Sequence, residues 1–366
     1  DISNGLESIP IPVYNEVDKC PPPANFQYIT ENVLGTGVNL CHGNPNFLSC
    51  CSCKDNCSDP TVCECALSMA GFAYDQKGSF FADKPGGVYE CNYLCSCHKD
   101  LCRNRLVSNG PNMPLEVYRC PEVGKGWGVR CAVELPIGTF IADYLGEVLN
   151  EVDAEARVEA DEYLFGMDAK ERMEKLLGGE LATKIFERPK ICNLIDYEAD
   201  SNIPRDKNKK SNVSMTYLDT IRNSGSRKRD IDKLLGSTGD LQACIADDSV
   251  SDAYTTRKKQ IRDARAALME RAMTEAETKN NTYTLDANHF GNVARFLNHS
   301  CTPNVEKVTV FCDSQDVRLP RVALFTSQVV PAGEELCYDY GYFQGNVEGK
   351  HRKCLCGSEK CRGNMY

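Results

Sequence analysis

The stretch RFLNHSC, at residues 295–301, and the stretch ELCYDYGY, at residues 335–342, bring an arginine, an asparagine, a histidine and three tyrosines into two short segments. Two further stretches precede them, GKGWGV at residues 124–129 and DEYLF at residues 161–165. Each stretch is a weak signal by itself, because glycines also serve turns, and tyrosines or an Asn–His pair are often packing residues. Their meaning depends on their order and on the chain around them.

Short apolar runs separated by turn residues surround these stretches. Residues 115–149 contain LEVY, VRCAVEL, PIGTF and IADYLGEVL, and a second zone begins at Tyr283 and continues through KVTVFC, RVALFTSQVV and EELCYDY. Runs of this length, rich in Val, Ile, Phe and Tyr, predict short β-strands. We expect the two zones to form one sheet system, so the predicted fold class is mainly β with α insertions.

A polar segment at residues 166–281 separates the two β-zones. It is charged and poor in aromatic side chains, so its middle is predicted to be a solvated or disordered insertion. Apolar spacing at residues 169–186 and a run of Ala, Arg, Glu and Met at residues 257–279 predict helices near its two ends. A docking arm and a tolerated loop expansion both fit this composition, and the expansion is favoured.

The overall charge argues against one class of partner. The 366 residues include 42 basic and 52 acidic side chains, which give a net charge of -10. That balance disfavours a general phosphate-binding surface and suits a cationic peptide partner. The chain shows neither a run of about 20 apolar residues nor a signal-like beginning, so we expect it to be soluble and intracellular.

The 22 cysteines gather mostly in three dense clusters. Without a secretory signal, cysteines at such close spacing favour metal-bound thiolates over disulfides, although a secreted disulfide scaffold is the alternative. Three Zn²⁺ ions can share nine thiolates if three sulfurs bridge two metals and six bind one metal each, whereas separate Cys₄ sites would leave one cysteine spare. The first two clusters supply these nine: Cys51, Cys53, Cys57, Cys63, Cys65, Cys91, Cys95, Cys97 and Cys102.

The third cluster lies at the end of the chain and supplies only three ligands, Cys354, Cys356 and Cys361. Cys301, in NHSC, is the best candidate for the fourth. A zinc ion shared between these segments would fix the last residues against the centre of the domain, where they could wall a pocket. We expect both kinds of site to be structural, because four thiolates leave no open position for substrate or water.

In its order of motifs, the chain resembles the SET-domain lysine methyltransferases of the Suppressor-of-variegation class. The pre-SET side of the resemblance rests on YECNYLCSC at residues 89–97 and CRNRLV at residues 102–107, and the post-SET side on CRGNMY at residues 361–366. The SETDB subfamily is most similar, because its SET domain is split by a long insertion. The implied domains are a pre-SET region at 1–106, a SET domain at 107–342 split at about 166–281, and a post-SET tail at 343–366.

This resemblance implies a SET-domain β-fold of short sheets with a pseudo-knot, in which RFLNHSC is threaded beneath a loop near ELCYDYGY. It places S-adenosylmethionine and a peptide on opposite faces, joined by a narrow channel. Gly126 would let the backbone approach the cofactor, Trp127 would offer it an aromatic face, and Arg295 would pair with its carboxylate. The family's cofactor pattern falls on Lys125, Gly126, Trp127, Asp161, Tyr163, Arg295, Asn298 and His299.

The catalytic positions implied by the resemblance are tyrosines. Tyr340 matches the family's catalytic tyrosine, whose hydroxyl positions the amine, and Tyr163 and Tyr338 are the other channel aromatics. Methyl transfer needs a neutral lysine amine, and a narrow apolar channel favours that form by desolvation and supplies proximity. The hydroxyl of Tyr338 would leave less room for an already methylated amine, so mainly mono- and dimethylation are expected.

The implied substrate is lysine nine of histone H3, with transcriptional silencing and heterochromatin formation as the outcome. We therefore expect a nuclear, chromatin-bound protein, with a cytoplasmic pool left open. The expected partners are the H3 tail and protein cofactors for activity or nuclear retention, without nucleic acid or membrane. The main rival is a catalytically silent, zinc-stapled SET scaffold that binds chromatin partners. A zinc-dependent nucleic-acid binder is disfavoured by the acidic balance.

Overall fold

The protein is mainly β, as predicted. The computed structural model describes residues 1–36, 38, 50–69, 71–81, 87–157, 163–167, 283–313, 315, 319–342 and 352–365. Within these ranges the α-helices are short, α1 at Glu64–Leu67 and α2 at Glu151–Arg157. The two helices predicted for residues 169–186 and 257–279 lie outside the described ranges. No helix in the described part of the chain is long and apolar enough to cross a bilayer.

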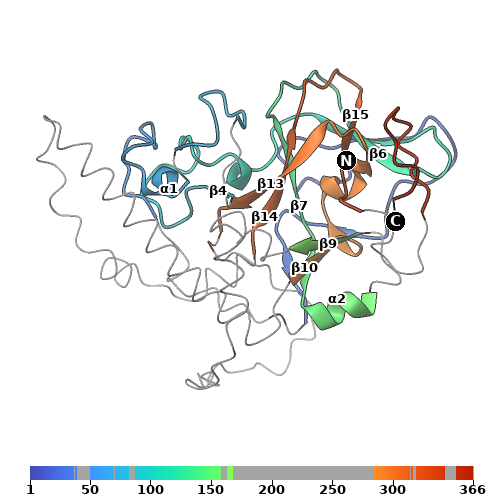
Figure 1. Ribbon diagram of the computed structural model, residues 1–366, viewed down its shortest axis with the longest axis horizontal. Coiled ribbons are helices and arrows are strands. Elements are labelled where there is room, and N and C mark those ends of the chain that lie inside the picture. Colours follow the sequence, from blue (N-terminus) through green and yellow to red (C-terminus); the bar gives the residue numbers. More distant parts are fainter. Residues whose placement is uncertain are drawn as a thin grey trace, which may run out of the picture.

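A central sheet unites the two β-zones of the sequence (Figure 1). Strand β7 is buried along its whole length and β14 is buried at all but its first residue, so both are nearly continuous apolar runs covered on two faces. The strands of the second zone lie between strands of the first, which confirms that the two zones form one system. The main strands in spatial order are β5 (Leu115–Arg119), β6 (Trp127–Cys131), β15 (Glu335–Tyr338), β13 (Val305–Phe311), β14 (Arg321–Thr326) and β7 (Phe140–Tyr144).

A second, smaller sheet brings the two sides of the insertion together. Strand β9 pairs with β10 in antiparallel fashion, with Met167 opposite Tyr283, so the chain leaves and re-enters the domain at neighbouring points. An insertion closed in this way can be long at little entropic cost. Strand β9 includes residues 166 and 167, which the sequence assigned to the insertion. The spatial order is β3 (Val33–Leu34), β8 (Glu147–Leu149), β10 (Tyr283–Asp286) and β9 (Leu164–Met167).

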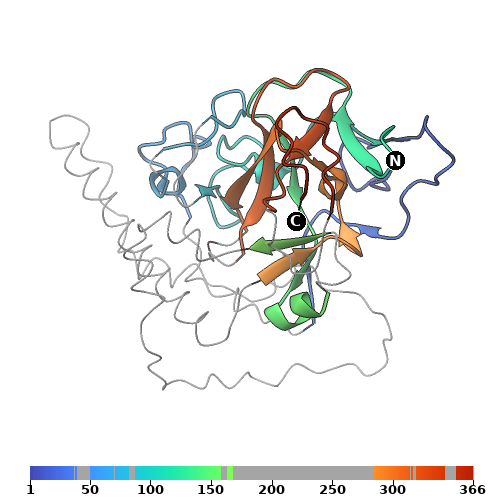
Figure 2. The same cartoon turned by 45° about the vertical axis from the view of Figure 1, so that its right-hand side comes forward.

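The cysteine-rich lobe, whose core residues lie between Cys50 and Val107, packs against one side of the central sheet (Figure 2). Strand β4 (Val88–Tyr89) extends that sheet by pairing in parallel with β13. The ring of Tyr89 stacks on Phe311 with centroids 4.7 Å apart. The lobe and the sheet therefore share one core, although the lobe itself has little regular structure.

The N-terminal segment contributes a strand to each sheet. Strand β1 (Val13–Tyr14) pairs with β5 in the central sheet, β3 pairs with β8 in the smaller sheet, and β2 (Gln27–Tyr28) pairs with β11 (Phe290–Gly291) in a separate two-stranded sheet. The described ranges also contain two 3₁₀ helices, η2 at Val107–Asn109 and η4 at Val293–Phe296.

The segment RFLNHSC lies beside ELCYDYGY. Strand β12 (Asn298–His299) runs parallel to β15, with Asn298 opposite Cys337 and His299 opposite Tyr338. The predicted pseudo-knot requires this contact between the two segments, while the threading itself stays a prediction.

Candidate active site

A pocket of about 450 Å³ opens where β6, η4, β12 and the C-terminal tail meet. Its size falls in the usual range for small-molecule sites, roughly 300–1,000 Å³. Asp161 lies outside the described ranges, but every other residue of the predicted cofactor set lines this pocket. These residues are Lys125, Gly126, Trp127, Tyr163, Arg295, Asn298 and His299, together with Tyr340.

Gly126 leaves open space at the pocket wall. Its φ angle is +80°, which residues other than glycine rarely adopt, and a Cβ built there would meet no atom within 4 Å. The turn is closed by a 2.9 Å hydrogen bond from the backbone N–H of Cys120 to the carbonyl of Gly126. A ligand can therefore approach the backbone closely at this point.

Glu335 organises the polar side of the pocket, and the sequence analysis did not single it out. Its carboxylate pairs with Lys125 Nζ and accepts a 2.8 Å hydrogen bond from Asn298 Nδ2. Asn298 Nδ2 also donates to the carbonyl of Trp127 at 3.0 Å. Burial would lower the pKa of Lys125, but the hydrogen bond and charge of Glu335 outweigh it and raise that pKa. Lys125 and Asn298 are thereby held in place around the pocket.

His299 connects the pocket to the C-terminal tail. Its Nδ1 accepts the backbone N–H of Tyr340 at 3.2 Å, and its Nε2 lies 3.3 Å from Arg362 Nη2. Arg362 also donates to Asp339 at 2.8 Å. Burial lowers the pKa of His299, so the neutral ring is favoured. Both ring nitrogens thus have partners within the protein.

Arg295 lies between aromatic rings. Its guanidinium carbon is 4.3 Å from the ring centroid of Tyr163 and 4.4 Å from that of Phe26, and its Nε donates to the carbonyl of Ala287 at 2.8 Å. Burial lowers its pKa, but an arginine stays charged in proteins. Arg295 lines the pocket and supports Tyr163, while the predicted pairing with a carboxylate stays a prediction.

A narrow aromatic cavity of about 30 Å³ adjoins the pocket and shares Tyr163, Arg295 and Tyr340 with it. Tyr163, Tyr338 and Tyr340, the three predicted channel residues, all line it. Four further lining residues, Tyr144, Leu164, Phe165 and Tyr342, were not predicted. We call this cavity the tyrosine channel: Tyr144, Tyr163, Leu164, Phe165, Arg295, Tyr338, Tyr340 and Tyr342.

Two of the channel tyrosines, Tyr338 and Tyr340, are fixed and protonated. Tyr340 donates its hydroxyl hydrogen to the carbonyl of Leu297 at 2.8 Å, and its ring lies 4.8 Å from that of Tyr338. Burial raises the pKa of both Tyr338 and Tyr340 above the ordinary value, so neither hydroxyl ionises near neutral pH. These groups can position an amine but are poor bases.

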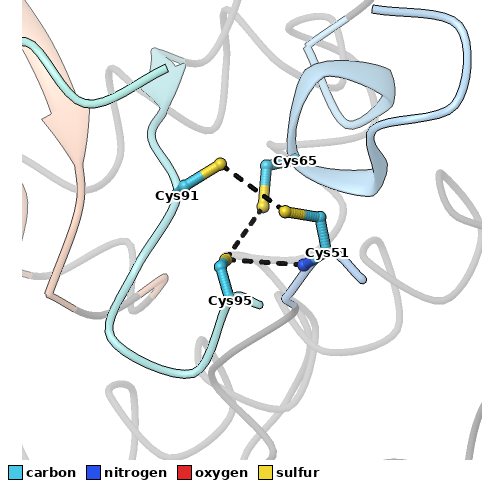
Figure 3. Close-up of side chains that lie close together, drawn as sticks. All are labelled: Cys51, Cys65, Cys91 and Cys95. Atoms are coloured by element: carbon cyan, nitrogen blue, oxygen red, sulfur yellow. Dashed lines mark hydrogen bonds between the residues drawn. The ribbon is translucent and has the colours of Figure 1, made fainter. Parts of the chain in front are cut away.

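The pre-SET cysteines form overlapping groups of four, one of which is drawn in Figure 3. Three of them, Cys51, Cys57 and Cys91, occur in more than one group, and their sulfurs lie 3.6–3.7 Å apart. Tetrahedral zinc with Zn–S bonds of about 2.3 Å would place its sulfurs about 3.8 Å apart. The geometry therefore fits zinc. The groups are Cys51, Cys65, Cys91 and Cys95; Cys51, Cys57, Cys63 and Cys91; and Cys57, Cys91, Cys97 and Cys102.

Cys53 is the ninth cysteine of the predicted three-zinc cluster. It belongs to none of these groups but is 9% exposed, and the charges of Cys63 and Cys51 act on it closely enough to help raise its pKa, after burial. With Cys53 as the terminal partner of Cys63, each of three zinc ions receives two bridging and two terminal thiolates. Arg105 lies 3.6 Å from the Cys97 sulfur and offsets part of the cluster's negative charge. The cysteines thus fit three zinc ions.

The C-terminal cysteines form a separate site at the pocket. The sulfurs of Cys301, Cys354, Cys356 and Cys361 lie within 4.8 Å of one another, as predicted from their positions in the sequence. Cys354, Leu355 and Cys356 line the pocket. The four sulfurs can hold one zinc ion, and closing this site positions the tail as a pocket wall.

Comparison with known proteins identifies two regions of the chain. Residues 3–105 match the Pre-SET motif, and residues 126–341 match the SET domain. Histone-lysine N-methyltransferase eggless of Drosophila melanogaster is 32% identical over 99% of this chain and 28% of its own length. Histone-lysine N-methyltransferase EHMT1 of Mus musculus is 30% identical over 99% of this chain and 19% of its own length. The chain thus spans less than a third of these two relatives.

Solved structures show the same fold. SUVH6 of Arabidopsis thaliana, in complex with SAM, has a TM-score of 0.59 and 27% identity, with 100% of this chain and 55% of that chain covered. KRYPTONITE, in complex with mCHH DNA, an H3(1-15) peptide and SAH, has a TM-score of 0.63 and 25% identity, with 100% and 53% covered. The chain belongs to the SET-domain family, and its Pre-SET motif places it in the Suppressor-of-variegation class.

Proposed function

We propose that this chain transfers methyl groups from S-adenosylmethionine to a lysine of the histone H3 tail, lysine nine. The observation that carries the proposal is the junction of a ligand-sized pocket with the tyrosine channel through Tyr163, Arg295 and Tyr340. A methyl donor in the pocket and an amine in the channel would meet at these residues. The narrow junction would hold the two groups close together and leave little room for water, and both effects favour methyl transfer to an amine.

The pocket residues fit the cofactor. When bound, S-adenosylmethionine supplies an electrophilic methyl group on a sulfonium. The open space at Gly126 admits the ligand to the backbone, and the neighbouring Trp127 offers an aromatic face. Glu335 holds Lys125 and Asn298 around the pocket, so these side chains are ordered before the ligand arrives. Such preorganisation reduces the cost of binding.

The tyrosine channel acts on the lysine. Its aromatic lining disfavours the charged ammonium, whose ordinary pKa is about 10.4, and so favours the neutral amine. The hydroxyl oxygen of Tyr340 is held by the carbonyl of Leu297 and keeps its lone pairs for the incoming group. Because its pKa is raised, Tyr340 orients the amine rather than removing its proton. The proton leaves to water before the amine is enclosed.

The substrate proposal has support from an edge strand. Strand β9 pairs with β10 on one side and ends the smaller sheet among the described strands, and Leu164 and Phe165 of β9 line the channel. A peptide strand added to this edge would present a lysine at the channel. SUVH6 is named as H3 lysine-9 specific, and KRYPTONITE was solved with an H3 peptide. The acidic balance of the chain suits such a cationic tail.

The finer parts of the proposal, such as the methylation state of the product and the cellular role, rest on the tyrosine channel and on the family resemblance. The hydroxyl of Tyr338, in the tyrosine channel, limits the room for a methylated amine, so mono- and dimethylation should dominate. A role in heterochromatin and silencing, a nuclear location and dependence on protein cofactors are part of this proposal. Membership of the SETDB subfamily also stays a prediction. The same holds for the absence of nucleic-acid binding, since KRYPTONITE was solved with DNA.

Transfer of labelled methyl to an H3 tail peptide tests the enzyme against the silent scaffold. We expect transfer by the zinc-replete protein, none to a peptide without lysine nine, and at least a 100-fold loss of kcat in Tyr340→Phe, on the scale of one lost transition-state contact or more. Tyr93→Phe, at an exposed tyrosine of the cysteine-rich lobe, is the matched control and should keep its activity. A wild-type protein that binds cofactor yet transfers nothing would establish the scaffold instead.

A further inference from the structure

Residues 23–26 lie within the Pre-SET match, yet this segment reaches the pocket that is proposed to hold S-adenosylmethionine. Pro23, Ala24 and Asn25 line the pocket, and the next side chain, Phe26, packs against the main hydrophobic core. Among the described residues that line the tyrosine channel, none comes from this segment. The pre-SET region therefore forms part of the pocket wall and stays away from the channel.

Phe26 contacts the arginine at the junction of pocket and channel. The guanidinium carbon of Arg295 lies 4.4 Å from the ring centroid of Phe26 and 4.3 Å from that of Tyr163. Both distances are within the roughly 6 Å over which an aromatic ring attracts a cation. Phe26 also meets Phe296 edge to face, with ring centroids 5.5 Å apart, and this contact fixes the ring of Phe26 against Arg295.

Phe26 and Arg295 are attached to the same segment, residues 287–291. Strand β2, which follows Phe26 directly, pairs with β11, and the N–H of Gln27 donates to the carbonyl of His289 at 2.7 Å. Arg295 donates two hydrogen bonds, of 2.8 and 3.3 Å, to carbonyls of this segment. The segment thus sets the distance between the ring and the guanidinium.

The backbone of the same segment also confines the stem of the arginine. A Cβ built on Gly291 would lie 3.0 Å from Cδ of Arg295, so a residue larger than glycine would displace the stem. With backbone at the stem and rings at the guanidinium, Arg295 has few positions to adopt. A long side chain loses much rotamer freedom on binding a ligand, so restraint before the ligand arrives reduces the cost of binding.

We propose that Phe26 is a positioning residue for Arg295, so that the pre-SET region completes the cofactor site. This inference rests on the proposed function. Phe26 acts through Arg295, which lines the pocket, whereas Phe26 is not among the described residues that line it. Loss of the ring should weaken cofactor binding more than it slows methyl transfer, because residues 23–26 meet the pocket and not the channel.

Calorimetric binding of S-adenosylhomocysteine tests this role in Phe26→Leu, which keeps apolar bulk but removes the ring face. We expect the Kd to rise roughly three- to 30-fold. The kcat at saturating S-adenosylmethionine should stay within about twofold of wild type. Phe26→Tyr keeps the ring and should keep the wild-type Kd. In an Arg295→Met background, Phe26→Leu should have little further effect, because the ring then has no charge to attract.

Controls separate the outcomes. Phe81→Leu, the same substitution at an exposed phenylalanine of the cysteine-rich lobe, should bind like wild type. Circular dichroism and zinc content show that each variant is folded, and Phe26→Met replaces Phe26→Leu, with the same expectation, if the latter is not. A wild-type Kd in the folded variant, or an equal loss in the Arg295→Met background, overturns the role of Phe26 while the proposed function stands. If the wild-type protein binds no S-adenosylhomocysteine, both fall.

Discussion

The two cysteine sites use the same ligands for different ends. All nine pre-SET cysteines are 9% exposed or less and belong to the core of their lobe, and among the described residues none of them lines the pocket. In the C-terminal site, three of the four cysteines are only partly buried, and Cys354 and Cys356 form part of the pocket wall. One site should therefore act mainly on stability, and the other on ligand binding.

The difference follows from where the ligands lie in the sequence. The pre-SET cysteines come from residues 51–102, so their metals close one lobe upon itself. The C-terminal site joins residues 354–361 to Cys301, two residues after His299, and so attaches the tail to the segment that forms the pocket. Both sites offer thiolates that can bind zinc, and the positions of these cysteines in the chain determine what each site does.

Removal of a bridging thiolate should have the largest effect. Cys91 bridges two of the three metals in this arrangement, so Cys91→Ser disturbs the shared cluster of the lobe. Structural zinc contributes on the order of 10 kcal/mol to folding, comparable to the whole stability of a domain. We expect loss of the folded protein, measured by circular dichroism and zinc content. Cys50→Ser, at a half-buried cysteine outside these groups, is the control and should remain folded with its zinc.

Graded chelation should separate the two sites in one protein. The C-terminal cysteines are more exposed than the pre-SET cysteines, so their zinc should leave first. We expect the first equivalent of zinc released to lower the affinity for S-adenosylhomocysteine by at least about tenfold, with the helix and sheet signal unchanged. The remaining three equivalents should leave together with unfolding. Release of all zinc in a single step would show that the two sites are not independent.

Several of these features were predicted from the sequence because they depend on short segments. Cysteine spacing gave the nine-thiolate count, and the choice of Cys301 as a fourth ligand agrees with the sulfur geometry. Alternating apolar runs gave the strands of both zones. The family pattern gave the pocket residues from Lys125 to His299, all but Asp161 lying in the described ranges. Local pattern and family order were sufficient for these.

Other features depend on pairings that one sequence does not specify. Glu335 faces Lys125 because β15 pairs with β6 in the register that sets Glu335 opposite Arg130, and an acidic residue at the start of a strand usually faces solvent. Phe165 joins the channel only through the pairing of β9 with β10. These contacts bring together residues far apart in the chain. Alternation gives two faces to a strand but does not say which face meets a pocket.

A smaller effect is expected at the link between the tail and the pocket. Arg362 contacts His299 and Asp339 at a partly exposed position, where an ion pair contributes about 1 kcal/mol or less. Arg362→Gln should therefore raise the KM for S-adenosylmethionine roughly three- to fivefold with kcat nearly unchanged and zinc content intact. Lys360→Gln, at an exposed lysine nearby, is the control. A fall in kcat without a change in KM would mean that the tail acts on the transfer step instead.

The smallest effect concerns the pH dependence of kcat/KM, which tests whether the C-terminal tail affects the tyrosine channel. Burial, then the charges of Cys337 and Tyr163, raises the pKa of Tyr340, and Arg362 is not among its causes. A raised tyrosine pKa keeps the hydroxyl protonated, so kcat/KM should rise with pH as free lysine deprotonates, without falling again up to about pH 10. Arg362→Gln should show the same profile. The tail is linked to Tyr340 through His299, which accepts the backbone N–H of Tyr340 and does not contact the tyrosine hydroxyl. A descending limb below pH 10 in the variant alone would show that the C-terminal site also tunes the channel, and would erase the division of roles between binding and transfer.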